Sequence, residues 1–261
     1  MDIDPAIRVA ADTLAEAGEI DALFLAGSYG RGAADAVSDI DLVALAPADR
    51  RTPVLEHWRT ILREHVSLVY WQAFPWGLAN AITDDWLRVD LYITSLDRFG
   101  TRSRANIKPI HDPDRVWDTL PAALPPATPN AATIERLTRE FIRVMGLLPV
   151  VLARREWVLM VRGTGLLRDK LVDLMIETSP EPDRGGALHP SRLLTPDQIA
   201  TLEALPYPGP DRSAVIAAHL AIAATFLPLA RQLYRETGMD WPDAFEAAMW
   251  AHLATAGVTP G

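Results

Sequence analysis

The stretch from Leu25 to Leu45, LAGSYGRGAADAVSDIDLVAL, constrains the fold more than any other part of the sequence. One apolar run stops at Gly27-Ser28, and a second apolar run carries Asp39 and Asp41 at alternate positions. Alternate residues of a strand point to the same face of a sheet. Two carboxylates side by side on a hydrophobic strand repel each other and resist burial, so they require a compensating cation. Mg²⁺ is the natural candidate, because hard oxygen ligands select it.

The Gly27-Ser28 turn supplies the second half of the expected site. Glycine lets the backbone come close to a phosphate, and amide N–H groups and the Ser28 hydroxyl can donate hydrogen bonds to phosphate oxygens. The alternative is a glycine-rich hairpin in which Asp39 caps a turn and Asp41 is a surface residue. The coincidence of glycine, serine and two aspartates with strands on both sides favours the phosphate and metal interpretation.

A Gly-Ser pair, ten intervening residues (29–38) and the sequence DIDL together resemble the signature of the DNA polymerase β-like nucleotidyltransferase superfamily. More narrowly, GSYGRG followed by SDIDL resembles the antibiotic (aminoglycoside and lincosamide) nucleotidyltransferases and the minimal nucleotidyltransferases. The likeness is specific over about 20 residues and extends more loosely over the first 115 or so. It implies an enzyme in which a substrate hydroxyl attacks the α-phosphorus of an NTP and pyrophosphate leaves.

The resemblance also implies a set of site residues. Mg²⁺, in one or two ions, would bridge the carboxylates and the triphosphate of the NTP, with ATP the expected nucleotide. Arg31, on the phosphate turn, could contact the β- or γ-phosphate, although it could equally be a solvated turn residue. The implied metal ligands among the motif residues are Asp39 and Asp41, and the implied nucleotide-binding residues are Gly27, Ser28, Arg31 and Ser38.

Asp90 is expected to be the third metal ligand and a catalytic residue. It lies in the middle of the strand predicted over 86–94, between Val89 and Leu91, and the resemblance places a third acidic residue on such a strand. The alternative is a strand aspartate that faces solvent. Asp84 and Asp85 lie close by in the sequence and are the next candidates.

The attacking hydroxyl must lose a proton, so the enzyme needs a general base. Asp90 could serve, or a carboxylate of the C-terminal half could reach the site. Glu156 is the expected catalytic residue there, because Arg155-Glu156 resembles an Arg-x-Glu neighbourhood of such helical domains. Glu140 and Asp169 are further candidates, and each of the three could instead form a surface or inter-helix ion pair.

The composition limits the class of partner. With 34 acidic against 25 basic residues the formal net charge is −9, and such a chain repels long polyanions. This favours a small acceptor, including a cationic one, over a nucleic acid. Zero cysteines fits a cytoplasmic protein with an oxygen-ligated metal. No apolar run looks long enough to span a bilayer, and the N-terminus lacks the basic start of a signal peptide.

The chain is expected to be α+β, with an N-terminal nucleotidyltransferase α/β head containing a mixed sheet, followed by a C-terminal helical bundle. Four prolines in the sequence LPAALPPATPN favour extended, semi-rigid chain and mark the boundary. We expect three segments: a catalytic domain over 1–118, a proline-rich linker over 119–130 and a helical substrate-binding domain over 131–261.

Hydrophobic periodicity places the individual elements. A covering helix is expected from Pro5 to Gly18, a short helix within 29–37, another helix from Pro53, and a loop or short helix around 75–77. The expected strands are 20–26, 40–46, 66–73, 86–94 and 107–111. The expected C-terminal helices are 133–151, 152–178, 196–204, 213–236 and 242–255, with a loop over 177–194.

The sequence therefore predicts a Mg²⁺-dependent enzyme that moves a nucleoside monophosphate, AMP first, to a hydroxyl of a small molecule. An aminoglycoside or lincosamide antibiotic is the first acceptor class. The alternatives are an antitoxin-like enzyme that modifies a protein, and an inactive nucleotide-binding module with a regulatory role. The acceptor and the oligomeric state stay open at this point.

Overall fold

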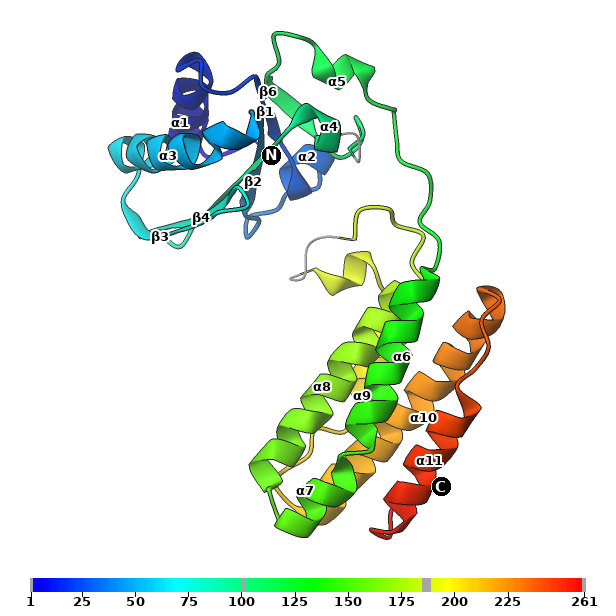
Figure 1. Ribbon diagram of the computed structural model, residues 1–261. Helices are drawn as coiled ribbons and strands as arrows, with labels where there is room; N and C mark the ends of the chain where they lie inside the picture. The colour runs from blue at the N-terminus through cyan, green and yellow to red at the C-terminus, as the bar shows by residue number, and fades with distance from the viewer. Residues whose placement is uncertain (1, 100–101, 185–188, 260–261) are drawn as a thin grey trace. The chain divides into compact units, whose positions relative to one another are not determined.

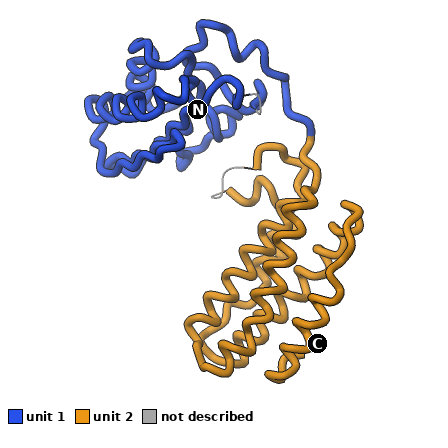
Figure 2. The backbone as a smooth tube through the Cα atoms, in the orientation of Figure 1, with its two compact units in different colours: residues 1–125 blue, residues 126–261 orange. Residues whose placement is uncertain are grey.

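The computed structural model describes residues 2–99, 102–184 and 189–259. It divides into two compact units, with the boundary in the sequence between Pro125 and Pro126 (Figure 2). Unit 1 spans Met1–Pro125 and unit 2 spans Pro126–Gly261. The predicted class is confirmed, because unit 1 combines a mixed sheet with helices and the elements of unit 2 are helices.

Unit 1 is built on a six-stranded sheet with the strand order β3-β4-β5-β2-β1-β6. Strands β2 and β5 pair in parallel, and the other neighbours pair antiparallel. The strands are β1 Ala22–Leu25, β2 Ile40–Leu45, β3 Leu68–Phe74, β4 Leu78–Thr83, β5 Arg88–Thr94 and β6 Lys108–His111.

One face of this sheet is covered by two helices, α1 (Pro5–Glu16) and α3 (Arg51–His65) (Figure 1). Asp4 caps α1 as expected, since its carboxylate accepts hydrogen bonds from the amides of Ala6 and Ile7. Apolar residues of both helices pack on the strand residues that alternate toward them, with Trp58 fully buried. This layer is the main core of unit 1.

The opposite face has a smaller core, which covers part of β1 and β2. Phe24 and Val43 pack there against Phe99 and Ile107, and the rings of Phe24 and Phe99 lie 4.9 Å apart. The remaining helical elements of unit 1 are short: α2 Gly27–Arg31, the 3-10 helix η1 Ala48–Arg50, α4 Leu96–Phe99 and α5 Val116–Thr119.

Strand β4 was not predicted from the sequence. A tight turn at Gly77, with φ of +102°, reverses the chain after β3, and the amide of Gly77 donates to the carbonyl of Phe74 at 3.0 Å. The signal for the strand is weak because two alanines and an asparagine interrupt it, and these residues have low β propensity. Pairing with β3 and β5 stabilises the strand instead.

Unit 2 is a helical bundle, and two of its predicted helices end earlier or begin later than expected. The helix predicted over 133–151 is two helices, because the first ends at the cap residue Gly146. The helix predicted over 152–178 begins later, at Trp157, because Arg155 adopts a left-handed conformation with φ of +56°. The elements are α6 Ala131–Met145, α7 Leu148–Arg154, α8 Trp157–Ile176, η2 Pro190–Arg192, α9 Pro196–Ala204, α10 Arg212–Glu236 and α11 Asp243–Ala254.

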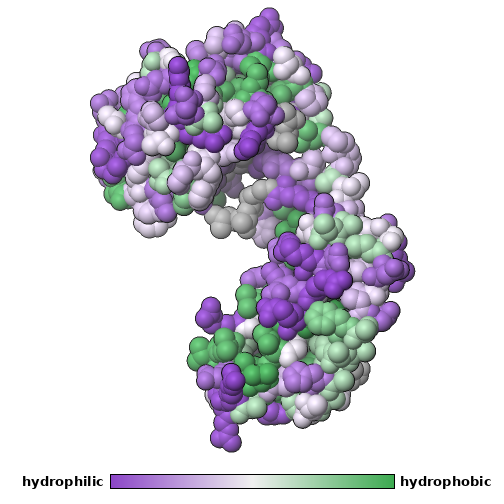
Figure 3. All heavy atoms as spheres, viewed as in Figure 1, coloured by the Kyte–Doolittle hydropathy of each residue, from purple (hydrophilic) through white to green (hydrophobic). Residues whose placement is uncertain are grey.

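The α10 helix is long and apolar enough to cross a bilayer by length and composition alone, although no such run was expected. Its residues Val215, Ile222, Phe226 and Leu233 are fully buried in the unit 2 core, and the ring of Phe226 stacks on that of Phe141 at 3.8 Å. These contacts are those of a central bundle helix. Figure 3 shows hydrophobic residues also gathered on the surface of unit 2 near α7 and the start of α8, where Val158 is 75% exposed.

Backbone hydrogen bonds tie the start of the proline-rich segment to unit 1 and its end to unit 2. The carbonyls of Pro121 and Ala122 accept hydrogen bonds from the amides of Arg104 and Ala105 in unit 1, at 2.9 and 3.0 Å. The amide of Ala127 donates to Pro180 of unit 2 at 2.8 Å. The separate roles predicted for 1–118 and 131–261, catalysis and substrate binding, stay predictions.

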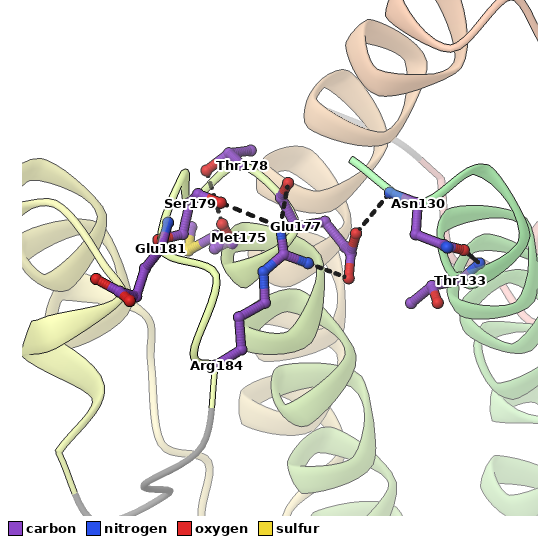
Figure 4. A network of polar contacts seen from close by, with 8 residues as sticks. All are labelled: Asn130, Thr133, Met175, Glu177, Thr178, Ser179, Glu181 and Arg184. Atoms are coloured by element: carbon purple, nitrogen blue, oxygen red, sulfur yellow. Dashed lines mark hydrogen bonds and ion pairs between the residues drawn. The ribbon is translucent and has the colours of Figure 1, made fainter. Parts of the chain in front are cut away.

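A buried carboxylate, that of Glu177, joins the start of α6 to the segment after α8 (Figure 4). It accepts from the amide of Asn130 at 2.8 Å and from Nη1 of Arg184 at 2.9 Å. Arg184 also donates to the carbonyl of Ser179 at 3.0 Å, and the side chain of Asn130 caps α6 by accepting from the amide of Thr133. One carboxylate therefore fixes two chain segments that are far apart in sequence.

We expect Glu177→Ala to lower the free energy of unfolding of unit 2 by about 2 kcal/mol, because it leaves the Arg184 guanidinium and the Asn130 amide without their acceptor. Thermal and urea unfolding of the full chain measure this. The matched control is Glu135→Ala, which removes an exposed i,i+4 ion pair with Arg139 and should cost less than about 0.5 kcal/mol. Equal losses in the two variants would contradict a structural role for Glu177.

Candidate active site

A row of four polar residues crosses four strands of unit 1 on the same face of the sheet. Asp41 of β2 pairs with Asp90 of β5, Asp90 pairs with Asn80 of β4, and Asn80 pairs with Gln72 of β3. Paired residues of neighbouring strands project to the same side. We call Asp41, Asp90, Asn80 and Gln72 the polar row. It lies on the face opposite α1 and α3, because its neighbours along β4, Ala79 and Ala81, are buried beneath those helices.

Asp90, the predicted third carboxylate, thus lies beside Asp41 rather than on the far face of the sheet. It is half-buried, and its carboxyl is hydrogen-bonded to the side chain of Asn80. Burial raises the pKa of Asp90 above its ordinary value, and the nearby charge of Asp39 raises it further. The Asn80 hydrogen bond and the charge of Arg88 oppose that rise in pKa.

Asp39 lies directly before β2, not within it. Its Oδ2 atom is 3.5 Å from Nη1 of Arg88, and Nη2 of the same guanidinium lies 3.5 Å from the carbonyl of Val37. Arg88 begins β5, two residues before Asp90 and on the same face. The guanidinium therefore supplies the positive charge next to Asp39 in this structure, a contact that the sequence analysis did not foresee.

Gly27 is required by the geometry of Asp41. A Cβ atom built on Gly27 would lie 1.8 Å from Oδ2 of Asp41, and the residue has φ of +55°. The backbone holds the two together, since the amide of Ala26 donates to the carbonyl of Asp41 at 2.8 Å. Any side chain at position 27 would collide with the carboxylate, so the glycine of the motif forms a cradle for Asp41.

The other predicted nucleotide-binding residues lie in or after α2. Ser28 is in the first turn of α2 and its hydroxyl is buried without a hydrogen-bond partner among the described residues. Arg31 is half-buried in the last turn of the same helix. The Ser38 hydroxyl accepts from the amide of Asp35 at 2.9 Å and donates to its carboxylate at 2.8 Å. Ser38 thereby stabilises the turn before Asp39, and its predicted contact with nucleotide stays a prediction.

Asp84 and Asp85, the alternatives for the third ligand, lie in the turn between β4 and β5. Both side chains are exposed. The carboxylate of Asp85 accepts a hydrogen bond from the hydroxyl of Thr83, and this bond lowers the pKa of Asp85. The pair therefore shapes the turn, whereas Asp90 is the carboxylate in register with Asp41.

The candidate bases in the C-terminal half all belong to unit 2. Glu156 precedes the first turn of α8 and is exposed. Glu140 forms an ion pair with Arg143 at 2.7 Å, which lowers the pKa of Glu140, and Asp169 is exposed on α8. The catalytic role predicted for Glu156 stays a prediction. Arg168 of α8 donates hydrogen bonds to the carbonyls of Leu202, Leu205 and Pro206 at 3.0–3.2 Å.

The residues present are suited to a hard divalent cation. Among residues 2–99, 102–184 and 189–259, no group of three His, Cys, Asp or Glu side chains is close enough together to hold a metal ion. Two carboxylates, those of Asp41 and Asp90, nevertheless share one face, and Asp39 lies near enough to Asp90 to affect its pKa. The cradle at Gly27 leaves the Asp41 carboxylate unobstructed by a side chain at position 27. Oxygen donors of this kind match Mg²⁺.

Sequence reasoning missed three polar residues at this site: Gln72, Asn80 and Arg88. The signal for Asn80 was the alternation of 78–82, in which a single amide stands between two alanines. Its meaning depends on recognising β4 as a strand, and that depends on pairing. The signal for Arg88 was its spacing of two residues before Asp90, which places both on one face.

No protein-family model and no curated protein matches the sequence. Among solved structures, the chain is similar to nucleotidyltransferases. An aminoglycoside 6-adenyltransferase from Bacillus subtilis has 12% identity and a TM-score of 0.43, with 97% of this chain and 98% of that chain covered. A Thermotoga maritima CCA-adding enzyme in complex with tRNA has 11% identity and a TM-score of 0.34, with 97% and 71% covered. Likeness at this level carries no argument about activity, which must come from the site.

Gly27→Ala should displace the Asp41 carboxylate. The added Cβ would overlap Oδ2 of Asp41, so that side chain must rotate away. The matched control is Gly18→Ala, where φ is +69° and nothing lies within 4 Å of the added atom. We expect both variants to lose about 1–2 kcal/mol from the left-handed backbone, and only Gly27→Ala to lose stabilisation by Mg²⁺ in thermal unfolding. Equal Mg²⁺ responses in the two would contradict the cradle.

Asp90→Asn should stabilise the metal-free protein at neutral pH. A folded-state pKa raised above the unfolded value of 3.8 means that the folded protein holds the proton more tightly. The free energy of unfolding therefore falls as pH rises from 3.8 through the folded-state pKa. The variant lacks this titrating group, so its free energy of unfolding in urea, with a chelator present, should exceed that of the wild type. The difference should be largest at pH 7 and vanish toward pH 3. Asp84→Asn is the control, and an advantage independent of pH would contradict the assignment.

Proposed function

We propose that this protein is a Mg²⁺-dependent nucleotidyltransferase that moves a nucleoside monophosphate from an NTP to a hydroxyl of a small molecule. One observation carries the proposal: Asp41 and Asp90 lie in register on adjacent parallel strands, with Asp41 against the Gly27 cradle. A carboxylate pair beside a glycine turn is an arrangement that suits a metal-bound triphosphate. The GSYGRG and SDIDL sequences resemble the corresponding motif of the superfamily.

Asp41 and Asp90 would bind the metal ion. Asp39 would leave Arg88 and become the third ligand. The bound Mg²⁺ would supply charge neutralisation for the triphosphate. The backbone at Gly27 and the Ser28 hydroxyl, which is buried and has no partner among the described residues, would donate hydrogen bonds to phosphate oxygens. The freed Arg88 would offer a second cation to the same anion.

The transfer itself makes one bond and breaks another. The acceptor oxygen bonds to the α-phosphorus, the bond from that phosphorus to the β-phosphate bridging oxygen breaks, and pyrophosphate leaves with the electron pair. The hydroxyl proton passes to a carboxylate. Asp90 is the favoured acceptor, because it lies in register with Asp41 at the carboxylate pair where the hydroxyl would react, and Glu156 is the alternative.

ATP as the nucleotide, an aminoglycoside or lincosamide as the acceptor, and a cytoplasmic location belong to this proposal. The net charge of −9 supports a small acceptor over a nucleic acid. An antitoxin-like enzyme would instead modify a protein, and an inactive module would bind nucleotide without turnover. One experiment distinguishes these three functions. The purified full chain is incubated with Mg²⁺, each NTP in turn and an antibiotic panel, and mass spectrometry detects an added nucleotide mass. Nucleotide binding without any transfer, to antibiotics or to proteins, would indicate the inactive module.

We expect Asp39→Asn and Asp41→Asn to abolish transfer, by at least about a hundredfold, while the protein remains folded. Mg²⁺ with ATP should raise the unfolding temperature of the wild type, because a ligand that binds only the folded state stabilises it. Asp90→Ala should lose most of that rise, and Asp84→Ala, the exposed control, should keep it. A retained rise in Asp90→Ala would remove Asp90 from the metal site, and unchanged turnover in the Asp41 variant would refute the metal-site proposal.

A further inference from the structure

Strand β3 is an edge strand that lacks the usual protection against pairing with another strand. It stands first in the strand order of the sheet, so among the described residues only β4 pairs with it. Every second residue of an edge strand directs its N–H and C=O groups away from the sheet, and these groups can bond a further strand. Soluble proteins block such pairing with charged side chains, prolines or very short edge strands. Strand β3 has 7 residues, LVYWQAF, and none of them is charged or a proline.

The opposite edge of the same sheet is protected. Strand β6 has 4 residues, KPIH, and it begins with the exposed residues Lys108 and Pro109. Lysine and proline both discourage pairing at an edge. The contrast extends to the sequence around β3, because residues 66–83 include no Asp, Glu, Lys or Arg, whereas 23% of the whole chain is charged. One edge of the sheet therefore discourages a further strand, and the other can accept one.

The two ends of β3 also expose apolar side chains. Val69 is 60% exposed and lies at a bulge, because the register with β4 shifts between Leu68 and Tyr70. From Tyr70 to Phe74 the strand then pairs regularly with β4. At the far end Trp76 is 58% exposed, and its ring stacks on that of Phe74 with centroids 4.5 Å apart. A regular and uncharged stretch of edge is thus bordered by exposed apolar surface.

This regular stretch is complementary to a second copy of itself. When two such strands pair antiparallel about a two-fold axis at Gln72, Tyr70 lies opposite the partner's Phe74. In the same register Trp71 lies opposite the partner's Ala73. Aromatic pairs opposite each other stabilise a sheet, and a large side chain packs well beside a small one. At the axis Gln72 meets the partner's Gln72, and two amides can bond each other because each carries donors and acceptors.

The charge of the chain favours this edge as the place where two copies meet. Each copy has a net charge of −9, which opposes association elsewhere on the surface. Because β6 is protected, pairing cannot continue at the other edge of the sheet, so the contact closes after two copies. Five paired residues on each side are far fewer than the about 20–30 of a stable interface, so we expect a weak dimer with a Kd of roughly 10–100 µM.

We propose that two copies of this chain associate through β3, whose outer edges pair antiparallel about Gln72 and join the two sheets into one. The polar row of each copy then ends at the shared axis, and the two rows form a single line. The inference is independent of the proposed transferase activity, because it uses only the backbone edge and the uncharged side chains of β3.

A cysteine at the two-fold position tests the register directly, because the chain has no cysteine of its own. Residues opposite each other in an antiparallel pair have Cα atoms about 4.5–5.5 Å apart, and a disulfide spans about 4.4–6.8 Å. Mild oxidation of full-length Gln72→Cys should therefore convert most of the protein into a covalent dimer that dithiothreitol reverses. The matched control is Gln232→Cys, at an exposed position of α10, which should remain mostly monomeric. Equal dimer yields in the two variants overturn the proposal.

Sedimentation equilibrium of the full chain tests association without a covalent bond. The wild type should change from monomer to dimer between about 5 and 500 µM, the range that brackets the expected Kd. Gln72→Lys and Gln72→Glu should each raise the Kd at least about tenfold, because like charges meet at the axis. Both should keep the far-ultraviolet circular dichroism of the wild type, since Gln72 is exposed. An equal mixture of the two variants should regain the dimer, because opposite charges then meet.

The matched control for the added charge is Gln232→Lys, which should dimerise like the wild type. A wild type that stays monomeric throughout this range overturns the proposal. A dimer that persists in both Gln72 variants places the contact elsewhere and also overturns it, as does a mixture of the two folded variants that stays monomeric. Assemblies larger than two copies would contradict the protected edge at β6 and hence the closed dimer.

Discussion

The parallel pairing of β2 with β5 is the constraint on which the site depends. It sets Asp41 beside Asp90 in a sheet whose other neighbouring strands run antiparallel. Two carboxylates at one strand spacing repel each other, and burial adds to the cost of their charges. The structure limits this cost at Asp90 in two ways: the Asn80 side chain hydrogen-bonds to its carboxyl, and the positive charge of Arg88 lies nearby. The site therefore stores unfavourable charge that a divalent cation would relieve.

The two faces of the sheet are packed to different extents, and this leaves the candidate site uncovered within unit 1. Residues that alternate toward α1 and α3 are apolar and buried, which provides the stability of unit 1. The opposite face is packed only in part, over β1 and β2, and the half-exposed residues of β4 and β5 remain available to ligands. This sheet, antiparallel except between β2 and β5, can tolerate such a solvated face, because antiparallel strands need only one buried side.

Glycine and arginine have unequal roles in this arrangement. Gly27 is fixed by sterics, since a Cβ there would overlap the Asp41 carboxylate. Arg88 is held by charge, at 3.5 Å from Asp39, a contact that is long for a hydrogen bond and partly exposed to water. A steric requirement is permanent, whereas an exposed ion pair can exchange its partner. This difference suits the proposed function, in which Gly27 would always accommodate Asp41 and Arg88 would leave Asp39 for a phosphate.

The sequence by itself determined the α+β class, with a sheet followed by helices, and it predicted Gly27, Asp39 and Asp41 as site residues, because both depend on local patterns: an alternation of period two, a glycine turn and a change to helical periodicity. It also indicated Asp90, through its central place in a strand. Only the tertiary structure decided that Asp90 lies in register with Asp41, that Asn80 and Gln72 extend the row, and that Arg88 contacts Asp39. Strand order and register are set by pairing between distant segments, and a single sequence does not display which segments pair.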